Sequence, residues 1–301
     1  MNTKAQYRLE PHEQFGFLQI KPVPSAEEIA RFYAEEFYSG QYRYFNNSAR
    51  EVQEADQAFH DGHRADVCAR IESLRGHPIA GATVLDIGCG WGLTLKYLQA
   101  RGARCAGFDP APEAVDYVRS CGIECVQGGM DRMDVFGDRR FDVVMLMNVL
   151  EHLSDPVQVL RQIHGQLLAP GGVLVIEVPN EFNAFQLAAQ EVYGLDSWWV
   201  APPAHLNYFN PATLRRLVEG SSMRVAHEEA SFPMEMFLLM GQNYVGTREL
   251  GRTCHESRMA FEANLRRTGH SDALSAFYQA LAAAGLGRQV IAYAMPVAAA
   301  A

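Results

Sequence analysis

The stretch Val84-Leu-Asp-Ile-Gly-Cys-Gly-Trp-Gly92 decides the fold of this chain of 301 residues. Four of the five residues 83–87 are aliphatic or β-branched, which predicts a strand, and residues 91–101 have the apolar spacing of a helix. Three glycines lie between these two segments. A strand that passes into a helix through a glycine-rich turn is typical of α/β proteins that bind a ligand at that turn.

Each loop glycine predicts a special backbone position. Gly88, Gly90 and Gly92 permit positive φ and let a ligand approach the backbone closely. Asp109 ends the next predicted strand, where its carboxylate can accept hydrogen bonds from both hydroxyls of a ribose. The spacing is G-x-G-x-G, not the G-x-G-x-x-G of dinucleotide loops. Asp86, just before the loop, would repel a pyrophosphate but could help to hold a ligand ammonium.

Strand and helix patterns alternate around this loop. The predicted strands are 83–87, 104–108, 123–127, 141–147 and 172–178, and the helices between them are 91–101, 112–120 and 155–168. Strands separated by such helices form right-handed βαβ units. We therefore expect an α/β fold, a Rossmann-like, doubly wound and mostly parallel sheet with helices on both faces. A strand at 289–296 is expected to return as an edge partner.

The chain divides into four expected regions. They are an N-terminal helical lid at 1–80, a cofactor-binding core at 81–230, a helical substrate cap at 231–288, and a final strand and tail at 289–301. In the first region Ser25 and Glu28 predict a capping box, and a helix is expected over 50–75. Its aromatic residues could cover the cofactor or form core; they are Phe32, Tyr33, Phe37, Tyr38, Tyr42, Tyr44 and Phe45.

Composition and charge exclude several classes of protein. The 26 Lys and Arg against 35 Asp and Glu give a net charge of −9, which disfavours nucleic acid as the main partner. No apolar run reaches the about 18 residues of a membrane helix, and the first ten residues lack the apolar core of a signal peptide. The six cysteines form no C-x-x-C pair, so we expect reduced thiols and no metal. We expect a cytoplasmic protein with a small-molecule partner and no membrane partner; a homodimer stays open.

Four motifs in order resemble the class I S-adenosylmethionine-dependent methyltransferases. They are VLDIGCGWG at 84–92, GFDP at 107–110, FDVVMLMNVLEHLSDP at 141–156 and LLAPGGVLVIEVPN at 167–180. The resemblance covers about 80–230 and implies S-adenosylmethionine as the cofactor. It places Asp86 and the glycine loop, Cys89 included, on the methionine part. It places Asp109 on the ribose, and Asn148 and Glu151 beside the methionine and sulfonium end.

The adenine side departs from the family pattern. Many relatives have an acidic residue straight after the glycine that follows the third strand, where this chain has Gly129. Met130 could pack against the adenine, and Asp131 or a backbone carbonyl could accept a hydrogen bond from the adenine amine. Alternatively, Met130 fills the core and Asp131 caps a helix. Both interpretations stay open.

Methyl transfer to a hydroxyl or an acidic carbon requires that the attacking atom be aligned with the methyl group. It also requires a base to remove a proton, and near neutral pH this base is most often histidine. His152 lies in LEHL just after the fourth strand, and His205 lies in HLNYF after the fifth. A similar stretch supplies a proposed base in deoxysugar C-methyltransferases. That resemblance favours His205 over His152 and points more weakly to Tyr208, although those enzymes carry a zinc module that this chain lacks. Either histidine could instead have a structural role, in which its ring orients a loop or closes a strand end by hydrogen bonding. The other histidines, His63 among them, are expected to be surface or structural.

Three functions are considered. The leading one is methyl transfer to a small molecule, such as a sugar, a nucleotide-linked sugar or a natural-product scaffold, on an O, N or C atom. A non-catalytic subunit that binds S-adenosylmethionine for regulation or assembly is the alternative. The glycine spacing disfavours a nicotinamide-dependent oxidoreductase. Arg252, His255 and Arg258 share a predicted helix face that could bind an anionic substrate or simply face solvent.

Overall fold

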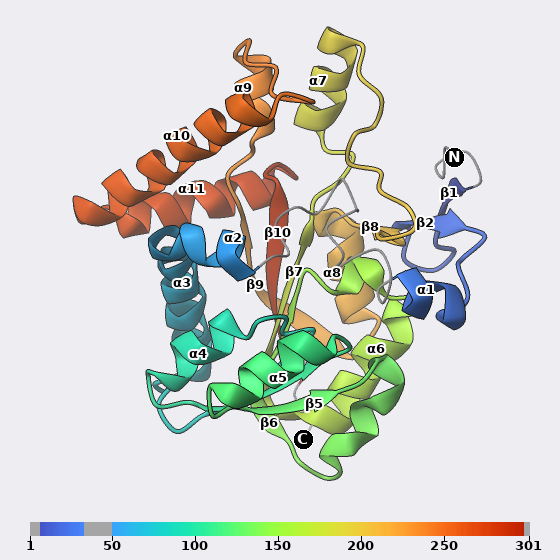
Figure 1. Cartoon of the computed structure of the whole chain (residues 1–301), viewed down its shortest axis with the longest axis vertical. Coiled ribbons are helices and arrows are strands. Elements are labelled where there is room, and N and C mark those ends of the chain that lie inside the picture. Colours follow the sequence, from blue (N-terminus) through green and yellow to red (C-terminus); the bar gives the residue numbers. More distant parts are fainter. Residues whose placement is uncertain (1–6, 33–49, 298–301) are drawn as a thin grey trace.

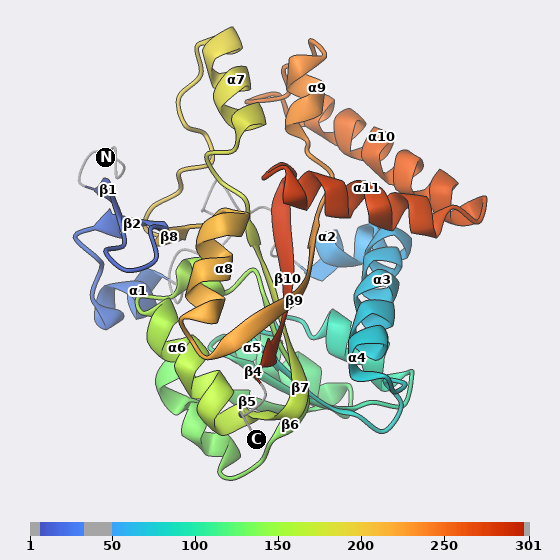
Figure 2. The ribbon, with the colours of Figure 1, turned by 180° about the vertical axis from the view of Figure 1, so that it is seen from behind.

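The computed structural model describes residues 7–32 and 50–297. One twisted sheet passes through the middle of the molecule, and helices cover both of its faces (Figure 1; Figure 2). This arrangement confirms the α/β, Rossmann-like fold that the sequence predicts.

The sheet has seven strands within the described residues, in the order β5-β4-β3-β6-β7-β10-β9. The strands are β3 (Thr83–Ile87), β4 (Arg104–Asp109), β5 (Glu124–Gln127), β6 (Phe141–Met147), β7 (Leu168–Pro179), β9 (Met223–Ala230) and β10 (Gln289–Pro296). Strands β3 to β7 run parallel, and β10 is antiparallel to both of its neighbours. Strand order reverses between β3 and β6, and ligands bind beyond the carboxyl ends of strands at such a point.

The final strand does not form the edge of the sheet, so the expectation of an edge partner is wrong. β10 lies between β7 and β9, and β9 is the edge strand. The sequence pattern does not mark β9 as a strand, because its segment MRVAHEEA mixes charged and apolar residues, most of which are only partly buried or exposed. A half-exposed edge strand lacks the apolar pattern that marks a central one.

Both faces of the sheet bury apolar side chains. One face packs against α3 (Gln57–Arg75), α4 (Leu93–Gln99) and α5 (Pro112–Ser120). The other packs against the 3₁₀ turn Met130–Phe136, α6 (Pro156–Gln162) with its π-helical extension Ile163–Leu167, and α8 (Pro211–Glu219). Burial on both sides explains why FDVVMLM of β6 is apolar almost throughout.

Four helices lie beyond the carboxyl end of the parallel strands (Figure 1). They are α7 (Ala184–Tyr193), α9 (Glu235–Leu239), α10 (Arg248–Arg267) and α11 (Ser271–Ala283). A third apolar cluster joins α9, α10 and α11 to the end of β9. Helix α9 is short, and a loop separates it from α10.

The N-terminal region is not wholly helical. Strands β1 (Arg8–Pro11) and β2 (Leu18–Lys21) form a small sheet with β8 (Asn207–Tyr208). The capping box of α1 (Ala26–Phe32) is confirmed, since Ser25 N–H donates to Glu28 Oε2 at 2.8 Å and Glu28 N–H donates to Ser25 Oγ at 3.2 Å. The helix expected over 50–75 divides into α2 (Arg50–Ala55) and α3. The aromatic residues from Tyr33 to Phe45 lie outside the described residues.

Candidate active site

The glycine loop between β3 and α4 has the backbone that the sequence predicts. The φ angles are +72° at Gly88, +50° at Gly90 and +62° at Gly92. A Cβ added at Gly88 would lie 2.5 Å from Val149 Cγ2, and one added at Gly92 would lie 2.6 Å from Val118 Cγ2. A Cβ at Gly90 would meet no described atom within 4 Å. Gly88 and Gly92 are therefore required by packing, whereas the backbone of Gly90 is open to a ligand.

The side chain of Cys89 points away from this open side. Its Sγ lies 3.8 Å from the Sγ of Cys125 on β5. A Cβ at Gly107 on β4 would meet both sulfur atoms, at 2.8 and 3.1 Å, so the glycine makes room for them. Cys89 can therefore face a ligand through its backbone, while its side chain packs against the sheet.

Asp109 ends β4 and fastens the glycine loop. Its Oδ2 accepts the N–H of Gly90 at 2.8 Å, and its Oδ1 accepts the N–H of Ala111 at 2.9 Å. Burial raises the pKa of this carboxyl, and the two N–H groups oppose the rise. Because each carboxylate oxygen has two lone pairs, Asp109 can hold the loop and still accept a hydroxyl donor.

Asp86 supplies a buried carboxylate directly before the loop. Its Oδ1 is buried and makes no hydrogen bond to any described residue. Burial, together with the charge of Asp109, raises the pKa of Asp86 to about 7, while Arg64 on α3 acts in the opposite direction. A buried carboxylate oxygen that lacks a hydrogen-bond donor is suited to bind the ammonium group of a ligand. S-adenosylmethionine, the cofactor that the sequence resemblance implies, carries such an ammonium group. The open backbone at Gly90 supports the same fit.

Helix α3 packs on one face of the sheet. At the carboxyl edge of the sheet, the side chains on this face are polar instead of apolar. Apolar residues of β3, β6, β7 and β10 line this face below the edge. Side chains alternate along a strand, so Asp86, Glu177 and Gln289 occupy the same face. His63 and Arg64, near the start of α3, lie over it. This row was not singled out from sequence, because its members are far apart along the chain.

Asn148 joins this row just after β6. Its backbone is left-handed with a φ of +56°, an unusual conformation for a residue with a side chain. Its Nδ2 donates to Glu177 Oε1 at 3.0 Å, and its Oδ1 accepts from Gln289 Nε2 at 2.9 Å. The structure therefore places Asn148 beside Glu177 at the carboxyl edge.

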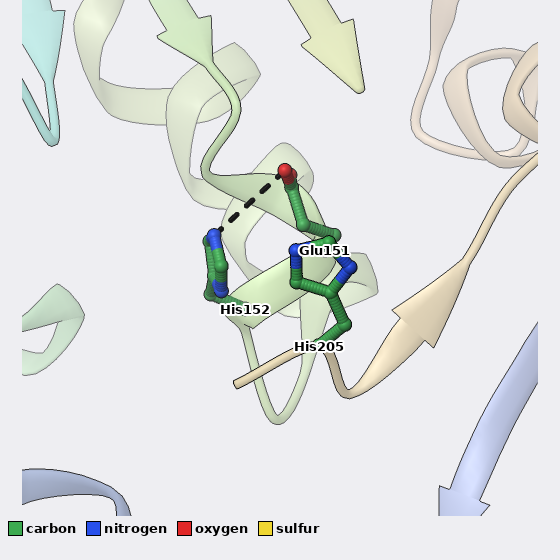
Figure 3. Close-up of side chains that lie close together, drawn as sticks. All are labelled: Glu151, His152 and His205. Atoms are coloured by element: carbon green, nitrogen blue, oxygen red, sulfur yellow. Dashed lines mark ion pairs between the residues drawn. The ribbon is translucent and has the colours of Figure 1, made fainter. Parts of the chain in front are cut away.

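Glu151, His152 and His205 gather at a second point (Figure 3). Glu151 and His152 lie in the 3₁₀ turn Leu150–His152 after β6, and His205 lies in the segment before β8. Glu151 Oε1 is 3.7 Å from His152 Nε2, and the two imidazole centroids are 5.0 Å apart. One ligand atom from each residue lies within 4.8 Å of the others, so the three could hold a metal ion, whereas the sequence predicts no metal site.

Burial controls the charge of these three groups. It raises the pKa of Glu151 well above the usual range, and it lowers the pKa of His152 to about 4. It also lowers the pKa of His205 well below the usual range, with the nearby His152 adding to this effect. His152 Nδ1 lies 2.7 Å from the carbonyl oxygen of Ala204, so the N–H of the neutral ring belongs on Nδ1. Both rings are neutral and weakly basic at neutral pH.

Tyr208 supports the segment that carries His205. Its buried hydroxyl donates to the His205 carbonyl oxygen at 3.2 Å and accepts the N–H of Ala201 at 3.1 Å. These contacts fit a role in holding the loop. The side chains of Met130 and Asp131 lie outside the described part of the structure, so both adenine assignments stay predictions.

Arg252, His255 and Arg258 on α10 each lie beside an acidic side chain. Arg252 donates to Asp56 at 2.8 and 3.0 Å and to Glu256 at 2.8 Å. Arg258 donates to Glu262 at 3.0 Å. These ion pairs favour the structural interpretation of this helix face over the binding of an anionic substrate.

Comparisons with known proteins bear on this geometry. A family model described as "Methyltransferase domain" matches residues 59–228, which is more than half of the chain. A ubiquinone biosynthesis O-methyltransferase of Azorhizobium caulinodans is 35% identical over 136 residues, or 43% of this chain and 50% of that protein. One from Methylobacterium sp. (strain 4-46) is 31% identical over 166 residues, or 52% and 65%. The chain thus spans about half the length of the first of these curated relatives.

The fold is also found among solved structures. The plantazolicin methyltransferase BpumL, solved in complex with S-adenosylhomocysteine (SAH), aligns with this chain with a TM-score of 0.53 and 14% sequence identity. The alignment covers 89% of this chain and 93% of that one, and at this identity it is evidence for the fold alone.

Among the described residues, no helix combines the length and the apolar character needed to cross a membrane.

Proposed function

The chain belongs to the methyltransferase-domain family, and from this premise we propose that the whole protein transfers a methyl group from S-adenosylmethionine to a small molecule. The cofactor supplies a methyl group on a positively charged sulfur. The open backbone of Gly90 carries this proposal, because its loop follows the buried carboxylate of Asp86 and is held by the buried carboxylate of Asp109. Asp109 suits the ribose and Asp86 suits the α-ammonium.

The acceptor that we propose is a sugar, a nucleotide-linked sugar or a natural-product scaffold. The relatives named as O-methyltransferases favour a hydroxyl as the attacking group. The helices α7, α9, α10 and α11 lie beyond the carboxyl edge, which supports a substrate cap over 231–288, while the N-terminal lid over 1–80 stays a prediction. The test is incubation with isotope-labelled S-adenosylmethionine and a panel of such acceptors, read by mass spectrometry. Label in no acceptor would favour a non-catalytic subunit.

Asp86 makes cofactor binding depend on pH. A carboxyl with a pKa of about 7 is protonated below that pH, and it must lose its proton to pair with an ammonium. We expect the affinity for S-adenosylhomocysteine (SAH) to fall as the pH drops below about 7, by up to about tenfold per pH unit. Calorimetry from about pH 5.5 to about pH 8.5 measures this, and Asp86→Asn should flatten the dependence. Equal affinity at both ends would remove Asp86 from the ammonium site.

The proton of a hydroxyl acceptor needs a base, and the sequence favours His205 over His152. If His205 is the base, His205→Ala should lower turnover about 10²–10⁴-fold while SAH still binds. Because its pKa is well below 6.5, such a base would be deprotonated throughout the neutral range. The wild-type rate would then be independent of pH between about pH 6 and about pH 8.

A further inference from the structure

An ion pair joins helix α3 to the carboxyl edge of the sheet. His63 Nε2 lies 3.0 Å from Oε2 of Glu177, which is two residues from the end of β7. The Glu177 side chain is 7% exposed, whereas that of His63 is 35% exposed. The carboxylate is therefore enclosed, and part of the imidazole remains accessible.

Two amides fix the carboxylate that faces His63. Glu177 Oε1 accepts from Asn148 Nδ2 at 3.0 Å and from Gln289 Nε2 at 2.6 Å. The N–H of Asn148 also donates to the Glu177 carbonyl oxygen at 2.8 Å. Holding Asn148 in a left-handed conformation carries a conformational cost that the surrounding contacts must offset. Glu177 is thus oriented by residues at the adjoining ends of its two neighbouring strands, β6 and β10.

The contact with Glu177 determines which nitrogen of His63 carries a proton. An ionised carboxylate only accepts hydrogen bonds, so Nε2 must donate to it. In the neutral ring Nδ1 then carries the lone pair, and it makes no hydrogen bond to a described residue. An acidic group that orients a partly exposed histidine is the arrangement of base and orienting group found in proton-abstracting sites.

We propose that His63 accepts the proton of the attacking hydroxyl through Nδ1, with Glu177 as its positioning residue. This role rests on the proposed function, and it assigns the base to a histidine that the sequence predicts to be surface or structural. In the step, the acceptor oxygen forms a bond to the methyl carbon, and the carbon–sulfur bond breaks with its electron pair going to sulfur. The hydroxyl proton passes to Nδ1, so the charge lost by sulfur appears on the imidazole and is stabilised by Glu177.

The position of the pair supports this role. His63 immediately precedes Arg64, whose charge acts on Asp86 at the proposed ammonium site. Glu177 contacts Asn148, which the family resemblance places at the methionine and sulfonium end. Glu177 therefore contacts a residue assigned to the methionine and sulfonium end, and His63 is next in sequence to a residue whose charge acts at the proposed ammonium site.

The charges around His63 predict its titration. Burial disfavours the charged ring, but Glu177 outweighs it and Asp66 adds to the effect, so the pKa of His63 lies above its usual 6.5. Arg258 on α10 acts in the opposite direction. His60, one turn earlier, has a pKa lowered to about 4 by burial and is neutral near pH 7. A rate that depends on His63 must therefore rise with pH through a midpoint above 6.5.

The first test needs no acceptor. Nitrogen-15 NMR of the full chain, with and without SAH, assigns the neutral tautomer and the pKa of His63. We expect the proton on Nε2, a bare Nδ1 and a pKa above 6.5 that falls in Glu177→Gln. A neutral ring protonated on Nδ1 would have no lone pair to offer and would overturn the proposal. The wild-type tautomer measurement does not depend on the folding of a variant.

The second test is kinetic and uses the acceptor that takes up most label in the panel. His63→Gln should lower the maximal rate about 10²-fold or more, with SAH affinity retained and the rise with pH abolished. In Glu177→Gln the side-chain amide can donate a hydrogen bond to His63 Nε2. The proton of the neutral ring then lies on Nδ1, which can no longer accept a proton, so we expect a similar loss of rate. His77→Gln, an exposed histidine just beyond the other end of α3, is the matched control and should keep the wild-type rate.

Two results would overturn the proposal. One is a His63→Gln variant that keeps the wild-type pH profile. The other is a wild-type rate that is flat across neutral pH and is lost in His205→Ala, which would assign the base to His205. A wild-type chain that methylates no acceptor would contradict the proposed function instead, and the tautomer measurement would still decide whether His63 can accept a proton.

Discussion

Replacing Gly90 by arginine should abolish the binding of SAH while the protein remains folded. The position has a φ of +50°, and no described atom lies within 4 Å of an added Cβ. A long side chain can therefore project into the open space in front of the loop without disrupting the core. It would occupy the space that the cofactor needs, and its charge would repel the α-ammonium. Calorimetry should detect no SAH binding, and the thermal melt should stay cooperative.

Gly122→Arg provides a matched control. Gly122 also has a positive φ, +74°, and also has no described atom within 4 Å of an added Cβ. It precedes β5, so it lies at the opposite, amino edge of the sheet. The backbone strain is similar in the two variants, whereas only Gly90 faces the proposed site. If both variants bind SAH as tightly as the wild type, the glycine loop is not the cofactor site.

Replacing Asp109 by alanine should weaken SAH binding by about 1–3 kcal/mol, or about 5- to 150-fold, because charge-assisted hydrogen bonds to the ribose are lost. The structure adds a second reason for the loss. Asp109 accepts the N–H of Gly90, so its removal also releases the loop from the end of β4. Isothermal calorimetry of the variant measures the loss directly.

Two further variants separate these contributions. Asp109→Asn keeps an oxygen for the Gly90 N–H but loses the charge, so we expect an intermediate affinity. Asp142→Ala removes an aspartate at the start of β6, on the amino edge of the sheet, where it accepts from Thr83 at 2.8 Å. That variant should bind SAH normally. An unchanged affinity in Asp109→Ala would exclude this residue from the ribose site.

The parts of the fold that are buried on both faces could be predicted from the sequence. The bounds predicted for β6 and β10 match those observed, because a central strand is apolar on both sides and ends abruptly at turn residues. Helix α5 was also predicted in full, since its proline start and apolar spacing are local signals. β1 and β9 could not be predicted, because strands that are largely exposed or half-buried lack such a pattern, and β2 has only four residues.

The candidate site divides in the same way. The glycine loop, Asp86 and Asp109 are contiguous with strand ends, and the motif itself marks them. His63 was missed because its partner Glu177 is 114 residues away and the pair exists only once α3 packs on β7. The low basicity of His205 is equally invisible in sequence, because it results from burial against His152 and not from the HLNYF motif.

We propose that the loop at 88–92 binds S-adenosylmethionine and not a nicotinamide dinucleotide. Calorimetric titration of the full chain with SAH and, separately, with NAD tests it most directly. We expect saturable binding of SAH at one site per chain, lost in Gly90→Arg, and no heat of binding with NAD. Binding of NAD in preference to SAH, or SAH binding that survives in Gly90→Arg, would contradict the assignment.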